Sequence, residues 1–240
     1  SKQAVARNNG INAAKGSILA FLDADDLWLP NKLELSLEYF DTSKYDLFFT
    51  NSFISSEEHI AISNRDFTTM SVKDQDYFGL AGIKEFIEWN RIPILTVLVQ
   101  KSIVIEVGMF DANCVPAEDY DLWLRLLIRG FKFKGIALPL SIYRLQPDSS
   151  TSLDRLATDA VLKSLLKNFS SEELKTYDVD PYLKKWIINW IDFRLDQHNI
   201  LTLKNYVYFF NLRNVSTRIL FTLHNFIGFK LFKRIFRKVI

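Results

Sequence analysis

Residues 17–28 read SILAFLDADDLW, and this stretch decides the fold expected for the first part of the chain. The apolar run 18–22 is short and bounded by turn-type residues, which is typical of a strand buried on both faces, as in a parallel sheet. It ends at three carboxylates, Asp23, Asp25 and Asp26. Ligands bind at the carboxyl ends of strands in open α/β sheets, so these side chains are candidates for holding a divalent cation on a diphosphate. The alternative is a solvated turn that caps the next helix.

Composition limits the possible classes of protein. The chain has 240 residues, 48% hydrophobic and 24% charged, which suits one domain with an appendage or two small domains. Its single cysteine, Cys114, excludes an internal disulfide and is consistent with a reducing compartment. The three histidines lack zinc-ligand spacing, and no apolar run reaches the roughly 18 residues of a spanning helix. Because the chain opens at Ser1 directly in a helical pattern, we expect a fragment.

The helical and strand periods predict two regions, residues 1–152 and 153–240. In the first, helices are expected over 1–15, 31–40, 82–90, 102–108 and 116–130, and strands over 18–22, 45–53, 95–99 and 131–145. Residues 55–80 are polar and weakly patterned, which predicts an irregular excursion. From Leu153 onwards the pattern is helical, with breaks near Ser170, Pro181 and Asn199.

The charge is distributed unevenly along the chain. Residues 201–240 hold eight Lys and Arg and no Asp or Glu, so they carry +8, while the first 200 residues carry −6. Within 229–240, basic and apolar residues fall on two faces of a predicted helix. The basic residues are Lys230, Lys233, Arg234, Arg237 and Lys238, and the apolar ones are Phe232, Ile235, Phe236 and Val239. Such a helix can lie in an anionic membrane interface with its apolar side down; the alternative is that this side packs on the protein.

The helix predicted over 116–130 begins with two acidic residues, Glu118 and Asp119. Acidic side chains are favourable at the positive end of a helix dipole, so a helix cap explains them without any catalytic role. Trp123 lies on the flank of the predicted apolar face of the same helix.

Four segments together resemble the family 2 glycosyltransferases with a GT-A fold. They are ARNNGINAAKGSILAFLDADDLWLPNKLE, VGMFDAN, AEDYDLWLRLLIRG and YRLQ, and they match the family in order and spacing over about residues 4–152. The resemblance implies an α/β, Rossmann-like domain with a mostly parallel sheet and flanking helices. It also implies that the first strands and the nucleotide-base pocket, which the family places before ARNNG, are missing. Residues 153–240 form an additional α-helical region.

The resemblance assigns donor-side roles. Asp23-Ala24-Asp25 matches the DXD motif, in which Asp25 would hold Mg²⁺ or Mn²⁺ on the donor diphosphate and Asp23 would contact the ribose or the metal shell. Asp26 follows the motif as a supporting or capping residue. Arg7, in the ARN segment, resembles a donor-side contact; the alternative is a surface arginine on a helix.

On the acceptor side, Asp119 matches the family's catalytic base and Glu118 its acidic neighbour. Trp123 would wall the acceptor site or, alternatively, lie in the core. Many relatives carry a histidine near the YR segment, where this chain has Gln146. An amide cannot replace an imidazole as a ligand, so a metal or phosphate role at this position does not carry over.

The implied function is that of a hexosyltransferase-like, inverting glycosyltransferase (EC 2.4) in surface polysaccharide synthesis. It would use a nucleotide-sugar donor, with a UDP-sugar favoured, and a glycan or lipid-linked acceptor, and it would bind no nucleic acid. We expect it in the cytoplasm, peripherally attached through residues 229–240 to the inner face of the cell membrane. The alternatives are another Rossmann-like enzyme, such as a nucleotidyltransferase, and a non-catalytic membrane-surface or nucleotide-sugar-binding module, inactive as a fragment. P-loop and dinucleotide-binding motifs are absent from the sequence.

Overall fold

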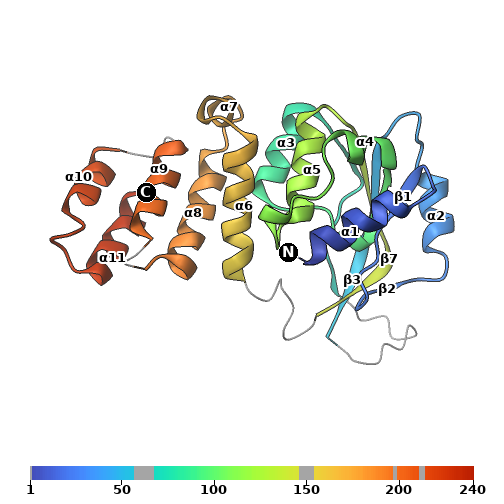
Figure 1. Ribbon diagram of the computed structural model, residues 1–240, viewed down its shortest axis with the longest axis horizontal. Helices are drawn as coiled ribbons and strands as arrows, with labels where there is room; N and C mark the ends of the chain where they lie inside the picture. The colour runs from blue at the N-terminus through green and yellow to red at the C-terminus, as the bar shows by residue number, and fades with distance from the viewer. Residues whose placement is uncertain (1, 57–67, 146–153, 197–198, 211–213) are drawn as a thin grey trace. The chain divides into compact units, whose positions relative to one another are not determined.

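A computed structural model gives the fold of the chain (Figure 1). The structure describes residues 2–56, 68–145, 154–196, 199–210 and 214–240. The chain folds as two compact units, Ser1–Ser152 and Leu153–Ile240. Gln146, singled out above, lies outside the described residues.

The first unit is built on one mixed sheet. Among the described residues its strands follow the order β1-β6-β3-β7-β2, while β4 pairs with β3 and β5 pairs with β7. The strands are β1 (Ile18–Ala20), β2 (Leu27–Trp28), β3 (Leu47–Ser55), β4 (Thr68–Thr69), β5 (Gln75–Tyr77), β6 (Leu98–Gln100) and β7 (Phe133–Arg144). The two long strands, β3 and β7, form the centre of the sheet.

The helices of the first unit surround this sheet, and α3 packs against α5 while α2 packs on β3 (Figure 1). They are α1 (Lys2–Ala13), α2 (Lys32–Tyr39), α3 (Gly79–Glu88), α4 (Lys101–Glu106) and α5 (Glu118–Ile128), with short 3₁₀ turns at Ile94–Thr96 and Ala112–Cys114. Gly130 ends the α5 turn with a positive φ of 90°, a conformation that glycine adopts without strain.

The expectation of a mostly parallel sheet is wrong for the described strands. Of their pairings only β3 with β7 is parallel, as in Leu47 beside Phe133. The other pairs are antiparallel, including β1 with β6 and β2 with β7. A short apolar run shows that a strand is buried, but its composition does not report the direction of the neighbouring strand.

The strand that precedes the Asp cluster lies at the edge of the described sheet. Within the described part of the chain β1 pairs only with β6, where Leu19 lies beside Val99. Leu19 is buried, but Ala20 on the opposite face of the strand is exposed, so the expectation of burial on both faces is also wrong. The apolar run is longer than the strand, because the chain leaves the sheet after Ala20 to present the carboxylates that follow.

A buried lysine joins α2 to the 3₁₀ turn before β6. Lys32 is fully buried, and its Nζ donates to the Thr96 carbonyl oxygen at 3.0 Å and to Ser36 Oγ at 3.2 Å. The ammonium lies 5.6 Å from the centre of the Trp28 ring. Burial lowers the pKa of Lys32 to about 8, because the charged form is poorly solvated there.

The second unit is helical throughout its described part, as the sequence predicts. Its helices are α6 (Asp154–Asn168), α7 (Ser171–Thr176), α8 (Asp180–Arg194), α9 (Ile200–Phe209), α10 (Val215–Leu223) and α11 (Phe229–Val239). The expected breaks match the helix starts: Ser170 caps α7 through the Glu173 N–H, Pro181 lies in the first turn of α8, and Asn199 precedes α9.

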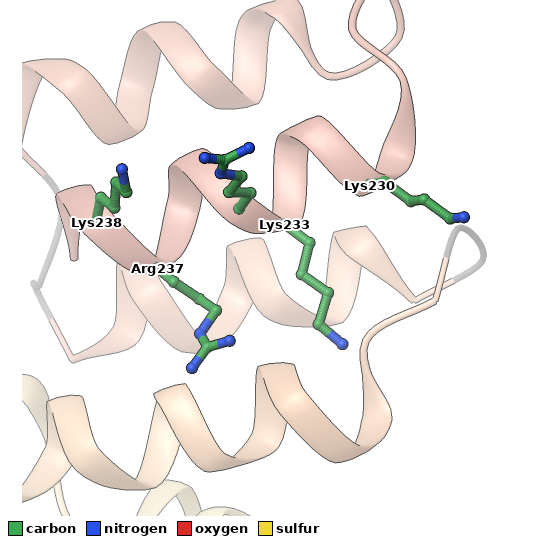
Figure 2. A pocket seen from close by; sticks show the side chains of 5 residues that line it. Lys230, Lys233, Arg237 and Lys238 are labelled. Carbon is green, nitrogen blue, oxygen red and sulfur yellow. The ribbon is translucent and has the colours of Figure 1, made fainter.

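The apolar side of α11 packs on the protein. Phe232 and Phe236 are fully buried, and their ring centres lie 5.8 Å and 5.3 Å from that of Phe221 on α10. The expectation that these two phenylalanines enter a membrane is therefore wrong, since they belong to the core of the second unit. The basic side chains of α11 remain at the surface (Figure 2).

The described helices include none with the length and apolar character needed to cross a bilayer.

Candidate functional site

Arg7 on α1 joins two carboxylates that are far apart in the sequence. Its Nη1 lies 2.6 Å from Glu118 Oε1 at the start of α5, and its Nη2 lies 2.8 Å from both oxygens of Asp23. The Arg7 side chain is 15% exposed. Burial alone would lower the pKa of Arg7, but the hydrogen bond to Asp23 and the nearby acidic charges raise it. The guanidinium therefore stays charged and connects the DXD segment to the start of α5.

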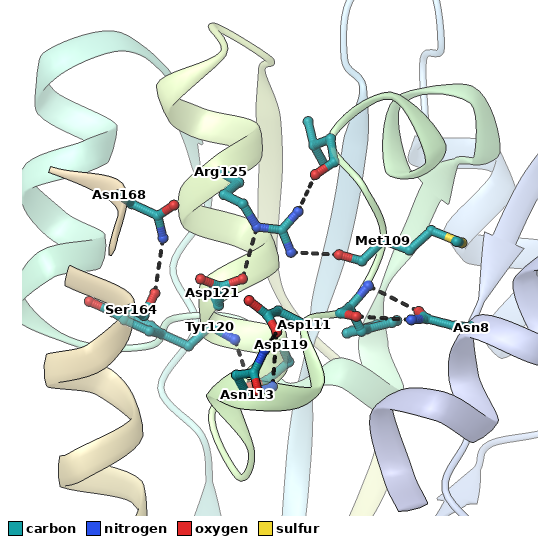
Figure 3. Close-up of polar contacts among 12 residues, drawn as sticks. Asn8, Met109, Asp111, Asn113, Asp119, Tyr120, Asp121, Arg125, Ser164 and Asn168 are labelled. Atoms are coloured by element: carbon teal, nitrogen blue, oxygen red, sulfur yellow. Dashed lines mark hydrogen bonds and ion pairs between the residues drawn. The ribbon is translucent and has the colours of Figure 1, made fainter. Parts of the chain in front are cut away.

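The backbone of Phe110 fixes the position of α1. Asn8 Nδ2 donates to the Phe110 carbonyl oxygen at 2.9 Å, and the Phe110 N–H donates to Asn8 Oδ1 at 3.0 Å (Figure 3). The Phe110 ring lies under the Arg7 guanidinium, whose central carbon is 5.6 Å from the ring centre. Asn8 and Phe110 thus place Arg7 from two sides, by paired hydrogen bonds and by a cation–π contact.

Asp119 is a partly buried carboxyl group beside this bridge. Its Oδ1 accepts from the Tyr120 N–H at 2.6 Å, and its Oδ2 accepts from Asn90 Nδ2 at 3.2 Å. Burial and the charge of Glu118 raise the pKa of Asp119 to about 6, against the opposing effects of these bonds and of Arg7. An Asp with a pKa near 6 is ionised at neutral pH and is a stronger base than an ordinary aspartate.

Neither of the two acidic residues lies at the cap position of α5. The residue at the cap position is Ala117, whose side chain makes no capping bond. Glu118 turns instead to Arg7, and its other oxygen, Oε2, is buried with no hydrogen-bond partner among the described residues. A buried carboxylate oxygen without a partner is costly, which is typical of an atom that binds a ligand.

The other two carboxylates of the Asp cluster differ in environment. Asp26 is buried, and its Oδ1 accepts from the Arg144 N–H at 3.0 Å, so it anchors the cluster to β7. Burial raises the pKa of Asp26 to about 6. Asp25 is exposed, and no side chain in the described part of the chain is hydrogen-bonded to it.

These carboxylates fit a hard divalent cation. Asp25 offers an exposed carboxylate, whereas both oxygens of Asp23 accept from Arg7. Mg²⁺ commonly binds proteins through one or two carboxylates, with substrate phosphates and water completing its shell. Asp25 is thus the better placed ligand of the two. Asp23 can contribute only if its oxygens bind the cation and Arg7 together, or if its hydrogen bonds to Arg7 break.

A second group of side chains could hold an ion. One ligand atom from each of Asp111, Cys114 and Asp121 lies within 4.8 Å of the others. Asp111 Oδ1 accepts from the Asn113 N–H at 2.9 Å, and Asp121 Oδ2 accepts from Arg125 Nε at 2.8 Å (Figure 3). The carboxylates of this group therefore already have structural partners.

Trp123 lies beneath the site and does not line it. Its side chain is fully buried, and its ring packs edge-on against Phe110 at 6.4 Å between centres. The interpretation of Trp123 as a wall of the acceptor site is therefore wrong. The core alternative holds, because Trp123 supports Phe110 and, through it, Arg7.

The structure thus brings together Arg7, Asp23 and Glu118 by direct bonds, with Asp119 next in sequence. It also adds two residues that the sequence did not single out: Asn90, which binds Asp119, and Asn8, which holds Phe110. Asn8 lies within the ARNNG segment that carries the resemblance, but no local signal marks Asn90, which simply follows α3.

Residues 1–93 match the model of the family described as "Glycosyl transferase family 2". Over these residues the chain is similar to glycosyl transferase family 2. The matched part contains Arg7 and the Asp cluster but ends before α5. The assignment of Asp119 and Glu118 therefore rests on the motif resemblance and the geometry above.

Curated relatives of the chain include two bacterial proteins. The Escherichia coli UDP-Glc:alpha-D-GlcNAc-diphosphoundecaprenol beta-1,3-glucosyltransferase WfaP is 27% identical over 67% of this chain and 59% of its own length. The putative teichuronic acid biosynthesis glycosyltransferase TuaG of Bacillus subtilis is 30% identical over 63% of this chain and 56% of its own. The chain spans about half the length of the curated relatives it matches.

The fold is similar to that of a solved structure, residues 1–349 of S. aureus TarS. The TM-score is 0.53 at 11% identity, and the match covers 86% of this chain and 59% of the other. TarS has also been solved in complex with UDP-GlcNAc. At this level of identity the likeness supports a GT-A-like α/β architecture for the chain and nothing further.

Proposed function

We propose that the protein is an inverting glycosyltransferase that moves a sugar from a nucleotide-diphosphate-sugar to a glycan or lipid-linked acceptor. The observation that carries this proposal is the Arg7 bridge, which joins Asp23 of the DXD motif to Glu118 beside Asp119. It brings the donor-side carboxylate and the candidate base into one site, although they are 96 positions apart in the sequence. The names of two relatives, a glucosyltransferase that acts on a diphosphoundecaprenol-linked sugar and a putative teichuronic acid biosynthesis glycosyltransferase, support the same class of reaction.

Asp119 is the proposed general base. An acceptor hydroxyl would form a bond to the anomeric carbon while the bond from that carbon to the diphosphate oxygen breaks, and the electron pair would leave with the nucleoside diphosphate. The hydroxyl proton would pass to Asp119, whose pKa of about 6 keeps it ionised at neutral pH. A positioned base of this kind contributes about 10²–10⁴-fold to the rate.

Asp25, with Asp23, is the proposed binding site for Mg²⁺ or Mn²⁺ on the donor. When bound, such a cation stabilises the charge that develops on the leaving diphosphate. Asp25 would orient the donor through this contact, and Arg7 would hold Asp23 in position beside it. GT-A enzymes typically use a divalent metal, which supports this assignment.

Glu118 is the proposed acceptor-side residue. Its Oε2 is buried without a partner in the described part of the chain, so it can accept a hydrogen bond from a sugar hydroxyl next to the one that Asp119 deprotonates. The name of WfaP gives that enzyme a sugar on diphosphoundecaprenol as acceptor, and we extend this class, a lipid-linked sugar, to the present protein. The reaction would then take place at the inner face of the cell membrane.

A donor screen tests the proposed function. The full-length protein is incubated with Mn²⁺, a polyprenyl-diphosphate-linked sugar, and UDP-glucose, UDP-GlcNAc or GDP-mannose in parallel, and the released nucleoside diphosphate is measured. We expect release from a UDP-sugar that depends on the acceptor. Calorimetric binding of a UDP-sugar without any release would instead support a non-catalytic nucleotide-sugar-binding module.

Arg7 is a positioning residue in this scheme, and its replacement should change the pH profile. Arg7→Gln removes a positive charge that lowers the pKa of Asp119, so that pKa should rise and the acidic limb of kcat/KM should move to higher pH. We also expect kcat/KM at pH 7 to fall by about 10- to 10²-fold, because Asp23 and Glu118 lose their shared donor.

A matched control is Arg129→Gln, since Arg129 is an exposed arginine that pairs with Glu106 at 3.0 Å, away from the site. Its pH profile should equal that of the wild type. An Arg7→Gln profile that keeps its limb at the wild-type pH would show that Arg7 does not act on Asp119.

A further inference from the structure

The α10–α11 hairpin, residues 215–239, has an inner face that is buried within the second unit. Phe221 of α10 packs on Phe232 and Phe236 of α11, and Asn214 Nδ2 donates to the Val239 carbonyl oxygen at 2.7 Å. This bond ties the start of α10 to the end of α11. The two helices of the hairpin are therefore held together by apolar packing and by a hydrogen bond.

Two basic side chains of α11 turn toward α8. Lys233 Nζ donates to the Asp192 carbonyl oxygen at 3.2 Å, and Arg237 Nη1 lies 3.3 Å from Asp192 Oδ1. Figure 2 shows both pointing to one side of α11, while Lys238 points to the opposite side. Asp192 thus places an acidic group of α8 against this helix.

The outward side of α11 carries three further cations in a line. Lys230, Arg234 and Lys238 are spaced by four residues, so they lie on one face of the helix, and all three are exposed. We call this set the basic stripe. It contributes to the hollow of about 500 Å³ that the five basic side chains of α11 line together.

An apolar line runs along the outward side of the neighbouring helix. Val215, Ile219 and Leu223 of α10, again spaced by four residues, are 70%, 55% and 42% exposed. We call this set the apolar stripe. Phe226, in the turn between the two helices, is 84% exposed, and it precedes Lys230 of the basic stripe by four residues. Exposed large apolar groups that lie together indicate a contact surface.

We propose that this outward surface of the hairpin binds an anionic lipid bilayer, with Phe226 and the apolar stripe at the level of the acyl boundary and the basic stripe on lipid phosphates. The bilayer interface offers hydrocarbon and phosphate at the same surface, which matches the two stripes. Residues 201–240 contain no Asp or Glu, so nothing acidic in this segment opposes the contact. A second copy of the hairpin would place one basic stripe against another and is disfavoured by charge.

This inference rests on the proposed membrane location and reassigns the residues responsible. The membrane-facing apolar groups are those of α10 and the turn, because Phe232 and Phe236 are buried. It does not depend on the chemistry of Asp119 or Asp25. Vesicle binding needs neither donor nor turnover, so its failure and a failure of the glycosyltransferase assignment can be told apart.

The first arm of the test addresses charge. The full-length protein is sedimented with vesicles of phosphatidylcholine alone or mixed equally with phosphatidylglycerol, at low and at high salt. Each basic side chain near an anionic surface contributes about a five-fold factor, so Lys230→Gln/Arg234→Gln/Lys238→Gln should bind anionic vesicles about 10²-fold more weakly. The control, Lys15→Gln/Lys44→Gln/Lys132→Gln, makes the same charge change at three exposed lysines of the first unit and should bind as the wild type.

The second arm addresses the apolar contact. Phe226→Ser should weaken binding by about ten-fold, because the variant loses the free energy gained when one aromatic side chain moves from water into the membrane interface. Phe78→Ser, at a phenylalanine of the first unit that is 55% exposed, is the matched control and should have no effect. Binding that is equal for neutral and anionic vesicles, or equal for the hairpin variants and their controls, would overturn the proposal. So would a concentration-dependent dimer that Phe226→Ser abolishes.

Discussion

Asp119→Asn should lower kcat of sugar transfer by roughly 10²-fold or more, while donor affinity changes little. The amide has nearly the same shape as the carboxylate, and its oxygen can still accept from the Tyr120 N–H, so the start of α5 should stay in place. What the amide lacks is the ability to take a proton at neutral pH. The loss should therefore appear in kcat and hardly in the donor dissociation constant, which calorimetry measures.

The pH dependence gives the same experiment a second readout. In the wild type, activity should rise as pH increases through about 6, because Asp119 becomes ionised in this range. In Asp119→Asn this limb should disappear. Asp180→Asn is the matched control, since Asp180 also lies in the first turn of a helix, α8, and should leave kcat unchanged. A comparable loss of donor affinity or of melting temperature in Asp119→Asn would instead identify Asp119 as a support of the site's structure.

Asp25→Ala should remove turnover that depends on Mn²⁺ or Mg²⁺, with kcat/KM falling on the order of 10²-fold or more. Asp25 is the exposed carboxylate of the cluster, whereas both oxygens of Asp23 already accept from Arg7, which makes Asp23 the poorer ligand. Activity would be measured across a Mn²⁺ titration. Asp41→Ala, at another exposed aspartate of the first unit, should give the wild-type titration curve.

The second possible ion group offers a direct alternative. If Asp25→Ala keeps near-normal activity in Mn²⁺ whereas Asp111→Asn loses it, the metal belongs with Asp111, Cys114 and Asp121. We expect the opposite result, because the Asp111 and Asp121 carboxylates already accept from Asn113 and Arg125. Asp111→Asn should act mainly on thermal stability.

Local sequence signals were sufficient for most elements of the fold. The period of the apolar residues located α1, α2, α3 and α5, and turn residues located the starts of the helices in the second unit. The short strands β2, β4 and β5 were missed, since two or three residues carry no period of their own. Strand direction was also missed, because the partner of a strand is set by tertiary contacts.

In the candidate site, too, features with a local sequence pattern were predicted and features set by tertiary contacts were not. The DXD motif and the acidic pair at 118–119 were recognisable as short patterns, but the Arg7–Glu118 bond joins residues 111 positions apart and has no local signature. The predictions that Trp123 lines the acceptor site and that the apolar face of α11 enters a membrane were wrong for a related reason. An amphipathic period shows that one face is apolar, but it does not say whether protein, substrate or lipid covers that face.

The position of β7 has a consequence for how the first unit folds. Leu27 of β2 pairs with Ile142, Leu47 of β3 with Phe133, and Gln75 of β5 with Gly135, so one late strand supplies partners to three early ones. Among the described strands β2 and β5 have no other partner, and β3 keeps one side unpaired, until β7 has left the ribosome. Closing such long loops costs entropy before any contact is gained, and folding slows accordingly. The sheet should therefore form late and cooperatively, in contrast to the helices of the second unit, whose contacts are largely local.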